Sequence, residues 1–211
     1  DNTVACVIVE PIQSMSGIRT ASSEWFSALR AKCTKAGCFL IFDEIQTGVG
    51  RMGQPFASHY FKVRPDFITS AKGLASGVPI GALMMTEAVA QHVKSHMLGS
   101  TFGGGPIACA ALIATLDIIQ NEHLMEHATQ MHAYLASALK NTMIDEVKGT
   151  GLLLGLKSHK ASDLKAYLLS QSVLVGGSSD PTVLRLMPPL NVRKSSLESL
   201  VEHIRAFGGK S

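Results

Sequence analysis

Two side chains of opposite charge, Asp43 and Lys72, each follow a short apolar run. Residues 38–42 (CFLIF) are typical of a strand that is buried on both faces of a parallel sheet, and they end at Asp43. Residues 67–69 form a second run, which leads into Lys72. Ligands of open α/β sheets bind at the carboxyl ends of the strands. We therefore expect one strand end to supply an acid and another to supply an amine.

An acid and an amine placed in this way have a defined chemical use. A lysine amine condenses with an aldehyde to form a Schiff base, and it can later carry a proton as general base and acid. An aspartate beside a pyridine nitrogen keeps that nitrogen protonated. Together they provide what pyridoxal 5'-phosphate (PLP) requires of a protein. From their spacing alone, however, Asp43 and Lys72 would be read as solvated surface charges.

The surrounding segments decide between these interpretations. In order along the chain they read VEPIQ (9–13), FDEIQTGVGR (42–51), PDFITSAKGL (65–74), GVPIGA (77–82) and STFGGGP (100–106). Together they closely resemble the class-III, or ornithine/acetylornithine-like, PLP-dependent aminotransferases, and the resemblance covers residues 4–207. It implies an α/β fold, the PLP-dependent transferase fold type I. Members carry a long segment before this point, so the resemblance also implies that the chain is the C-terminal half of a member.

The resemblance gives roles to residues around the two strand ends. Lys72 corresponds to the lysine that forms the Schiff base, and Asp43 to the acid that pairs with the pyridine nitrogen, which makes them the catalytic pair. Ile45 matches the position that packs on one face of the cofactor ring. Gln46 matches the position that contacts the ring hydroxyl, although without the family it would be an ordinary turn residue.

The segment STFGGGP predicts a phosphate site. Hydroxyl groups and backbone N–H groups suit a phosphate, although a glycine triplet can also be a flexible loop. The resemblance makes Ser100 and Thr101 cofactor ligands, with Thr101 reaching the phosphate held by a partner subunit. It thus implies a homodimer with the active site at the subunit interface. Many members have asparagine where Gly105 stands, which leaves the loop geometry open.

A further position concerns the substrate. Arg185 lies in VLRLMPPL, and in the family the arginine of this pattern binds a substrate carboxylate, for which a guanidinium is well suited. The alternative is an arginine that extends to solvent from an edge strand. Many members pair this arginine with a glutamate at the position of Met15, and methionine cannot do so. Glu10 and Gln13 end the first strand, and we expect them to support the pocket from behind.

The order of the apolar and polar runs predicts two domains. Residues 4–9 and 38–42 read as parallel strands joined by a helix, which Ser22 or Ser23 begins and Gly37 ends. We expect residues 1–143 to be the C-terminal part of a large PLP-binding domain with a parallel sheet. Residues 144–211 read as a small C-terminal α+β domain, with strands at 152–156, 173–175 and 183–187.

The sequence also predicts several local features. The first helix should bury Trp25, Phe26, Leu29 and Cys33. A polar loop is expected at 13–20 and a short helix at 87–96. Pro106 should begin a helix. Ser195 and Glu198 form the pattern of a capping box for the last helix.

Composition excludes several classes of protein. Hydrophobic residues make up 46% of the chain and charged residues 17%, which is typical of a globular protein with a large core. A net charge of +3 without a basic run gives no reason to expect a nucleic-acid partner. No apolar stretch is long enough to span a membrane. The four cysteines lack CxxC spacing and read as reduced thiols of a cytoplasmic protein, and the histidines show no metal-ligand pattern.

The predicted function is PLP-dependent transamination. An amino group would pass from an amine or amino-acid donor to a 2-oxo acid in a ping-pong reaction. The same residues could serve an aminomutase, a racemase or a decarboxylase, because the cofactor carries the difficult chemistry. The chain could also be a non-catalytic scaffold half-subunit. In each case we expect a complementary N-terminal half.

Overall fold

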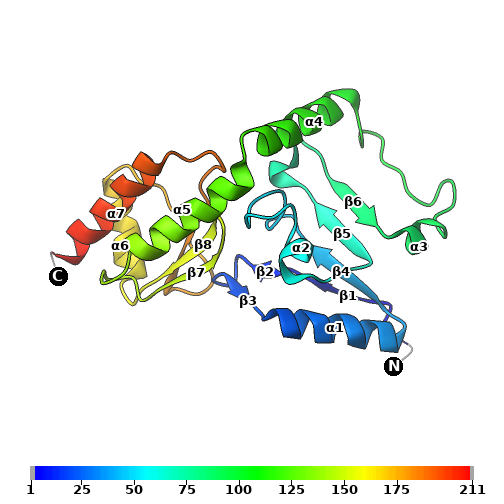
Figure 1. Ribbon diagram of the computed structural model, residues 1–211, viewed down its shortest axis with the longest axis horizontal. Coiled ribbons are helices and arrows are strands. Elements are labelled where there is room, and N and C mark those ends of the chain that lie inside the picture. Colours follow the sequence, from blue (N-terminus) through cyan, green and yellow to red (C-terminus); the bar gives the residue numbers. More distant parts are fainter. Residues whose placement is uncertain (1–2, 210–211) are drawn as a thin grey trace. The chain divides into compact units, whose positions relative to one another are not determined.

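The chain divides into two compact units in the computed structural model, which describes residues 3–209 (Figure 1). The first unit takes in the chain up to Pro11 together with Ala21–Gly50 and Gln54–His123. The second takes in Ile12–Thr20, Arg51–Gly53 and the chain from Leu124 onward. The sequence pattern predicts one boundary near Met143, whereas two short early segments and α5 (Leu124–Ala138) join the second unit. The assignment of a large and a small domain stays a prediction.

The first unit is built on a four-stranded sheet in the order β1-β4-β5-β6. The strand β4 pairs in parallel with β1 and with β5, whereas β6 runs antiparallel to β5. The predicted parallel strand–helix–strand unit is confirmed, and the helix predicted at 87–96 is shorter. The elements are β1 (Cys6–Val9), α1 (Ser23–Ala36), β4 (Phe39–Asp43), α2 (Ala57–Phe61), β5 (Phe67–Ser70), the 3-10 turn η1 (Lys72–Ala75), β6 (Ala82–Met85), α3 (Glu87–Ala90) and α4 (Pro106–Asn121).

One face of this sheet is buried and the other is open among the described residues. Leu40 and Phe42 are fully buried, and the Phe42 ring lies 5.5 Å from that of Phe26 on α1. Phe39 points to the opposite face and is 45% exposed. The prediction that residues 38–42 are buried on both faces is therefore wrong, because alternation along the strand turns every second side chain to the open face.

Helix α1 forms largely as the sequence predicts. The Ser22 hydroxyl accepts a hydrogen bond from the N–H of Trp25 at 3.3 Å, which satisfies a free donor of the first turn. Gly37 ends the helix with φ at +69°, a conformation that glycine adopts without strain. Phe26 and Cys33 are buried. The prediction that the Trp25 side chain is buried is wrong, because this side chain is 48% exposed.

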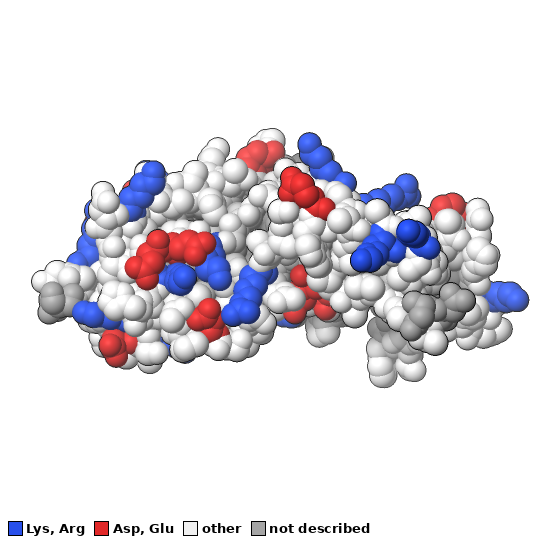
Figure 2. Space-filling model, turned by 90° about the horizontal axis from the view of Figure 1, so that it is seen from below, with Lys and Arg blue, Asp and Glu red and all other residues white. Residues whose placement is uncertain are grey.

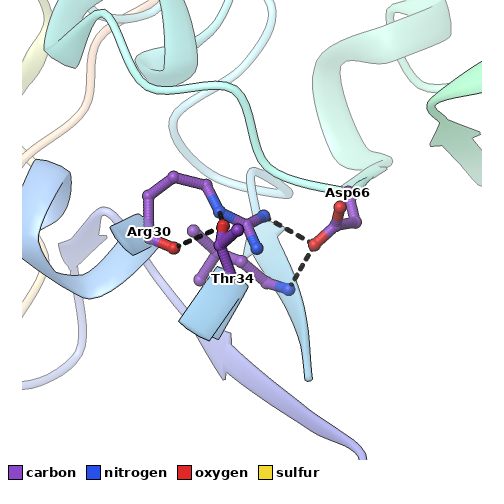
Figure 3. Close-up of polar contacts among 4 residues, drawn as sticks. Arg30, Thr34 and Asp66 are labelled. Atoms are coloured by element: carbon purple, nitrogen blue, oxygen red, sulfur yellow. Dashed lines mark hydrogen bonds and ion pairs between the residues drawn. The ribbon is translucent and has the colours of Figure 1, made fainter. Parts of the chain in front are cut away.

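An ion pair fixes α1 to the starts of β4 and β5 (Figure 3). The Arg30 guanidinium donates to the Asp66 carboxylate at 2.6 Å and to the Thr34 hydroxyl at 3.1 Å. The same Asp66 oxygen accepts from the N–H of Leu40 at 2.7 Å. Because this pair is partly buried and hydrogen-bonded to the backbone, it sets where the two parallel strands begin.

The second unit contains a three-stranded antiparallel sheet in the order β7-β8-β9 and a two-stranded hairpin. Its core joins the sheet with leucines of α6 and α7, including Leu164, Leu168 and Leu200. The elements are β2 (Ile12–Gln13), β3 (Arg19–Thr20), α5, β7 (Glu146–Thr150), β8 (Leu153–Lys157), α6 (Ala161–Ser170), β9 (Val183–Leu186) and α7 (Lys194–Gly208).

Several local predictions for this unit are wrong. Residues 13–20 form the β2–β3 hairpin in place of a loop, and β7 occupies a stretch for which the sequence predicts no strand. Residues 173–175 form no strand, and next to them only an isolated bridge joins Gly176 with Arg185. The capping box fails because the last helix begins earlier, after Arg193, without a side-chain cap.

Charged side chains of both signs are interspersed on the face drawn in Figure 2. This agrees with the small net charge of +3, which gives no single-sign field to attract a polyanion. Within the described part of the chain, no helix is both long and apolar enough to cross a membrane. The four cysteines are free; Cys33 and Cys38 are buried, whereas Cys6 is exposed.

Gly151 supplies a test of how closely the second unit is packed. Its φ is +57°, and a Cβ atom there would lie 2.4 Å from the carbonyl oxygen of Arg51. We expect Gly151→Ala to lower the free energy of unfolding by about 2–5 kcal/mol, the sum of left-handed strain and overpacking. Gly37→Ala is the control, because that glycine is also left-handed but has open space around it. It should cost about 1–2 kcal/mol. Equal losses in urea unfolding would contradict the packing explanation.

Candidate active site

The carboxylate of Asp43 is oriented by the neighbouring strand. Asp43 ends β4 and is paired in register with Thr69 of β5. The Thr69 hydroxyl donates to Asp43 Oδ1 at 3.1 Å, and the N–H of Ile45 donates to the same oxygen at 3.1 Å. Oδ2 has no hydrogen-bond partner among residues 3–209. One oxygen is thus fixed by the protein, and the other is available to a donor.

Lys72 begins the η1 turn directly after β5. Its φ is +49°, in the left-handed region that non-glycine residues seldom adopt, and such strained positions often occur at functional sites. Helix α4 packs on this turn, where the hydroxyls of Thr115 and Ser76 lie 3.1 Å apart. Because β4 and β5 are parallel neighbours, Asp43 and Lys72 follow adjacent strand ends at one edge of the sheet.

Glu44 is the acid next to Asp43, and it points into the core of the first unit. It is fully buried, and its Oε1 accepts from the N–H of Ser58 at 2.9 Å. Oε2 accepts from the Thr47 hydroxyl at 3.0 Å and from the N–H of Ala57 at 2.5 Å. The carboxylate therefore ties the turn after β4 to the first turn of α2. Burial raises the pKa of the Glu44 carboxyl above its ordinary value, although these hydrogen bonds oppose the shift.

The other predicted cofactor residues lie in loops of the first unit. Ile45 and Gln46 are half-buried in the turn that Glu44 holds. Ser100 and Thr101 are exposed in the connection between α3 and α4, where the N–H of Gly103 donates to the Ser100 carbonyl oxygen at 3.4 Å. No hydrogen bond of the described chain joins Ser100 or Thr101 to Asp43, so their role as ligands stays a prediction.

The remaining predicted residues divide between the two units. Glu10 belongs to the first unit, and Gln13, on β2, belongs to the second. Arg185 also lies in the second unit, on β9, and is half-buried. Its Nε donates to the Gly177 carbonyl oxygen at 2.5 Å, and its Nη1 donates to the hydroxyl of Ser14 at 3.0 Å. The guanidinium is therefore held within the second unit and does not extend freely from an edge strand.

Arg51 is a residue whose importance the sequence pattern does not reveal, because its surroundings read as a glycine-rich loop. It belongs to the second unit, where its Nη1 donates to the carbonyl oxygens of Pro188 and Leu152. The N–H of Leu152 donates back to the Arg51 carbonyl oxygen at 2.8 Å. Pro188 follows the strand that carries Arg185, so Arg51 fixes the end of that strand. The sequence signal that could have identified Arg51 is its position at the end of the segment FDEIQTGVGR.

Known proteins resemble this chain over nearly its whole length. The profile of the aminotransferase class-III family matches residues 1–207. Acetylornithine aminotransferase of Archaeoglobus fulgidus is 38% identical over 202 residues, which cover 96% of this chain and 53% of that protein. The corresponding enzyme of Aquifex aeolicus is 37% identical and is matched over 97% of this chain and 54% of its own. The structure of acetylornithine aminotransferase from Elizabethkingia anophelis superposes with a TM-score of 0.87 at 30% identity, covering 97% of this chain and 56% of that one.

The chain belongs to the class-III aminotransferase family. This confirms the resemblance found in the sequence motifs and the prediction of the PLP-dependent transferase fold type I. The chain spans about half the length of the curated relatives it matches.

The residues of this class-III chain fit PLP by the chemistry of their donor groups. Lys72 offers an amine for the aldehyde, and Asp43 offers the oxygen Oδ2 for a protonated ring nitrogen. The hydroxyls of Ser100 and Thr101, with the backbone N–H groups of the glycines that follow, offer hydrogen bonds for a phosphate.

Glu44→Gln tests the buried carboxylate through the pH dependence of stability. A carboxyl whose folded pKa is raised stabilises the fold most below its unfolded pKa, about 4.3, and loses that contribution as pH rises through the folded pKa. We expect Glu44→Gln to be less stable than wild type by about 1–3 kcal/mol, because its NH₂ group faces donors. That difference should shrink as pH rises, measured by urea unfolding.

Glu24→Gln is the matched control for this measurement. The Ser22 hydroxyl lowers the pKa of the exposed Glu24 carboxyl, so its contribution is present above the unfolded pKa and is lost as pH falls. The difference between wild type and Glu24→Gln should therefore grow as pH rises. Two difference curves with the same slope would show that the Glu44 contribution does not come from burial of its charge.

Proposed function

We propose that the complete protein containing this chain is a PLP-dependent aminotransferase. It would move an amino group from an amine or amino-acid donor to a 2-oxo acid in a ping-pong reaction. The observation that carries this proposal is the placement of Asp43 and Lys72 at adjacent ends of parallel strands in a class-III chain. When bound, PLP supplies an aldehyde for the amino group and a ring that accepts electrons.

The residues of the chain divide the remaining work. Lys72 holds the cofactor through its amine and, once released, moves a proton at the substrate carbon as general base and acid. Asp43 is a charged acceptor for the ring nitrogen, and Thr69 and the N–H of Ile45 keep its carboxylate in place. Ile45 packs against the ring and Gln46 contacts the ring hydroxyl. Both belong to the turn that Glu44 fixes from within the core.

Further residues have proposed roles in binding and support. Ser100 and Thr101 bind the phosphate, with Thr101 serving the cofactor of the partner subunit in a homodimer. Arg185 binds a substrate carboxylate. Glu10 and Gln13 support the pocket without touching the reacting atoms.

The proposal includes a complementary N-terminal half. Its support is the open face of the first unit's sheet, where Ile8 and Phe39 are exposed, and the exposed side chains of Ile107 and Ile113 on α4. Apolar faces of this kind are stabilised when another surface excludes water from them. We propose that the N-terminal half and the partner subunit cover them. The free thiols favour the cytoplasm, a reducing compartment, as the location.

Lys72→Ala tests the cofactor lysine in the complete protein. The variant should lose the covalent link to PLP, because alanine has no amine. Borohydride reduction followed by peptide mass spectrometry measures that link. Lys62→Ala is the matched control, since Lys62 is also exposed and its backbone also has a left-handed conformation, with φ at +55°. A reduced adduct found on Lys62, or one that survives in Lys72→Ala, would exclude Lys72 as the cofactor lysine.

Asp43→Asn tests the acid beside the ring. Asparagine preserves the shape of the side chain but carries no charge to hold a protonated nitrogen, so we expect single-turnover rates to fall by about 100-fold or more. Thr69→Val removes only the hydroxyl that orients Asp43, and it should slow the reaction by about tenfold at most. Unchanged rates in Asp43→Asn, with PLP bound, would refute the role of Asp43.

A further inference from the structure

The slot that holds Arg185 is built from glycines and neutral oxygen atoms of the second unit. Gly155 of β8 lies opposite Arg185 in the sheet, and Gly176 bridges to it on the other side. A Cβ atom at Gly176 would lie 3.4 Å from Arg185 Cβ and 3.5 Å from Nη2. The neighbours of Arg185 on both sides in the sheet therefore have no side chain, and the arginine stem lies within van der Waals distance of the Cβ position of Gly176.

Ser14 is the residue that orients the far end of this side chain. It is fully buried, and its hydroxyl accepts from Arg185 Nη1 at 3.0 Å. A buried hydroxyl that accepts from a guanidinium is held firmly, since either partner would lose free energy if left unpaired. The Gly177 carbonyl oxygen accepts from Nε on the other side. Both acceptors are neutral.

No carboxylate compensates the charge of Arg185 within residues 3–209. The ion pairs of this part of the chain join Arg30 with Asp66 and Lys194 with Glu198. The carboxylate of Asp180, in the loop beside Gly177, bonds instead to Thr182. The hydroxyl and the N–H of Thr182 donate to Asp180 Oδ1 at 2.6 and 3.0 Å. A guanidinium has five N–H donors, so Arg185 keeps donors free for a bidentate anion.

The segment that carries Ser14 is fixed to the same loop. The carbonyl oxygen of Met15 accepts from the N–H of Ser179 at 2.8 Å and from the Ser179 hydroxyl at 3.1 Å. The Met15 side chain is 54% exposed and makes no polar contact with Arg185. The backbone at 14–15 is thus held in place, and it presents a hydroxyl to the guanidinium where an acid at Met15 would present a charge.

We propose that Ser14 is a positioning residue that holds Arg185 as an uncompensated cation and so selects substrates with a carboxylate in both half-reactions. This inference rests on the proposed function. A neutral hydroxyl leaves the guanidinium charge free, so a substrate carboxylate binds without first breaking an ion pair. A donor without a carboxylate leaves that charge unpaired in the pocket, which is unfavourable.

The test uses the PLP-loaded complete protein and the variants Ser14→Ala, Met15→Glu and Ser179→Ala. Ser14→Ala should raise KM for amino-acid donors and for 2-oxo acids by about tenfold, with kcat within about twofold, because a hydrogen bond that orients a charged group is lost. Alkylamine donors should be unaffected. Met15→Glu should also weaken carboxylate substrates, since its acid competes for Arg185. Ser179→Ala is the control and should change neither, because the Ser179 N–H still holds Met15.

A binding measurement separates this inference from the proposed function. Calorimetry with glutarate, a dicarboxylate without an amino group, reports on Arg185 without turnover. Wild type should bind glutarate, and Ser14→Ala and Met15→Glu should bind it about tenfold more weakly. If wild type turns over no donor and glutarate still follows this pattern, the proposed function fails and the role of Ser14 stands. If Ser14→Ala affects alkylamines and carboxylates equally, or leaves glutarate binding unchanged, the inference about Ser14 is overturned.

Discussion

The end of β4 places two adjacent carboxylates on opposite faces of one sheet, and the arrangement of the site depends on this alternation. Successive side chains of a strand point in opposite directions, so Asp43 and Glu44 lie in different environments. Asp43 faces the open side, where one hydroxyl and one N–H orient it. Glu44 faces the core, where its oxygens accept hydrogen bonds from one hydroxyl and two backbone N–H groups. One carboxylate is available to a ligand because the other one anchors the turn.

Glu44 also explains why the turn after β4 can hold Ile45 and Gln46, the residues proposed to contact the cofactor ring, in a fixed position. Loops are usually mobile, but here a buried carboxylate joins the turn to the N–H groups of Ala57 and Ser58. These hydrogen bonds offset part of the cost of burying the charge, and they would be lost if the turn moved. Ile45 and Gln46 therefore sit on a supported backbone, as their proposed role requires.

Sequence patterns predicted the elements that depend on neighbouring residues. Helix α1 is bounded by Ser22 and Gly37, and the strands before Asp43 and Lys72 follow from their apolar runs. Sequence patterns failed to predict the structure where it depends on distant parts of the chain. Whether Phe39 or Trp25 is buried depends on what covers that face, and the β2–β3 hairpin joins a unit whose other strands come more than a hundred residues later. For the site, the motifs identified Asp43, Lys72 and Arg185 as candidates, but they gave no partners for any of them.

The hydrogen bonds of Arg185 show why a partner cannot be inferred by matching one position to a family pattern. Methionine at position 15 cannot supply the acid that many members pair with this arginine, and the motif does not show what holds the guanidinium instead. The preceding residue holds it, because the N–H of Ser179 donates to the Met15 carbonyl oxygen and so fixes the segment that presents the Ser14 hydroxyl to the guanidinium. An acid in this loop would bring a full charge into contact with the arginine, whereas the serine brings a dipole that orients the arginine without neutralising it. Since an arginine remains charged at any physiological pH, a neutral partner leaves its electrostatic preference for anions intact. Substrate preference in this chain is therefore expected to follow the identity of residues 14 and 15 together, and a substitution at either one should be interpreted with the other in view.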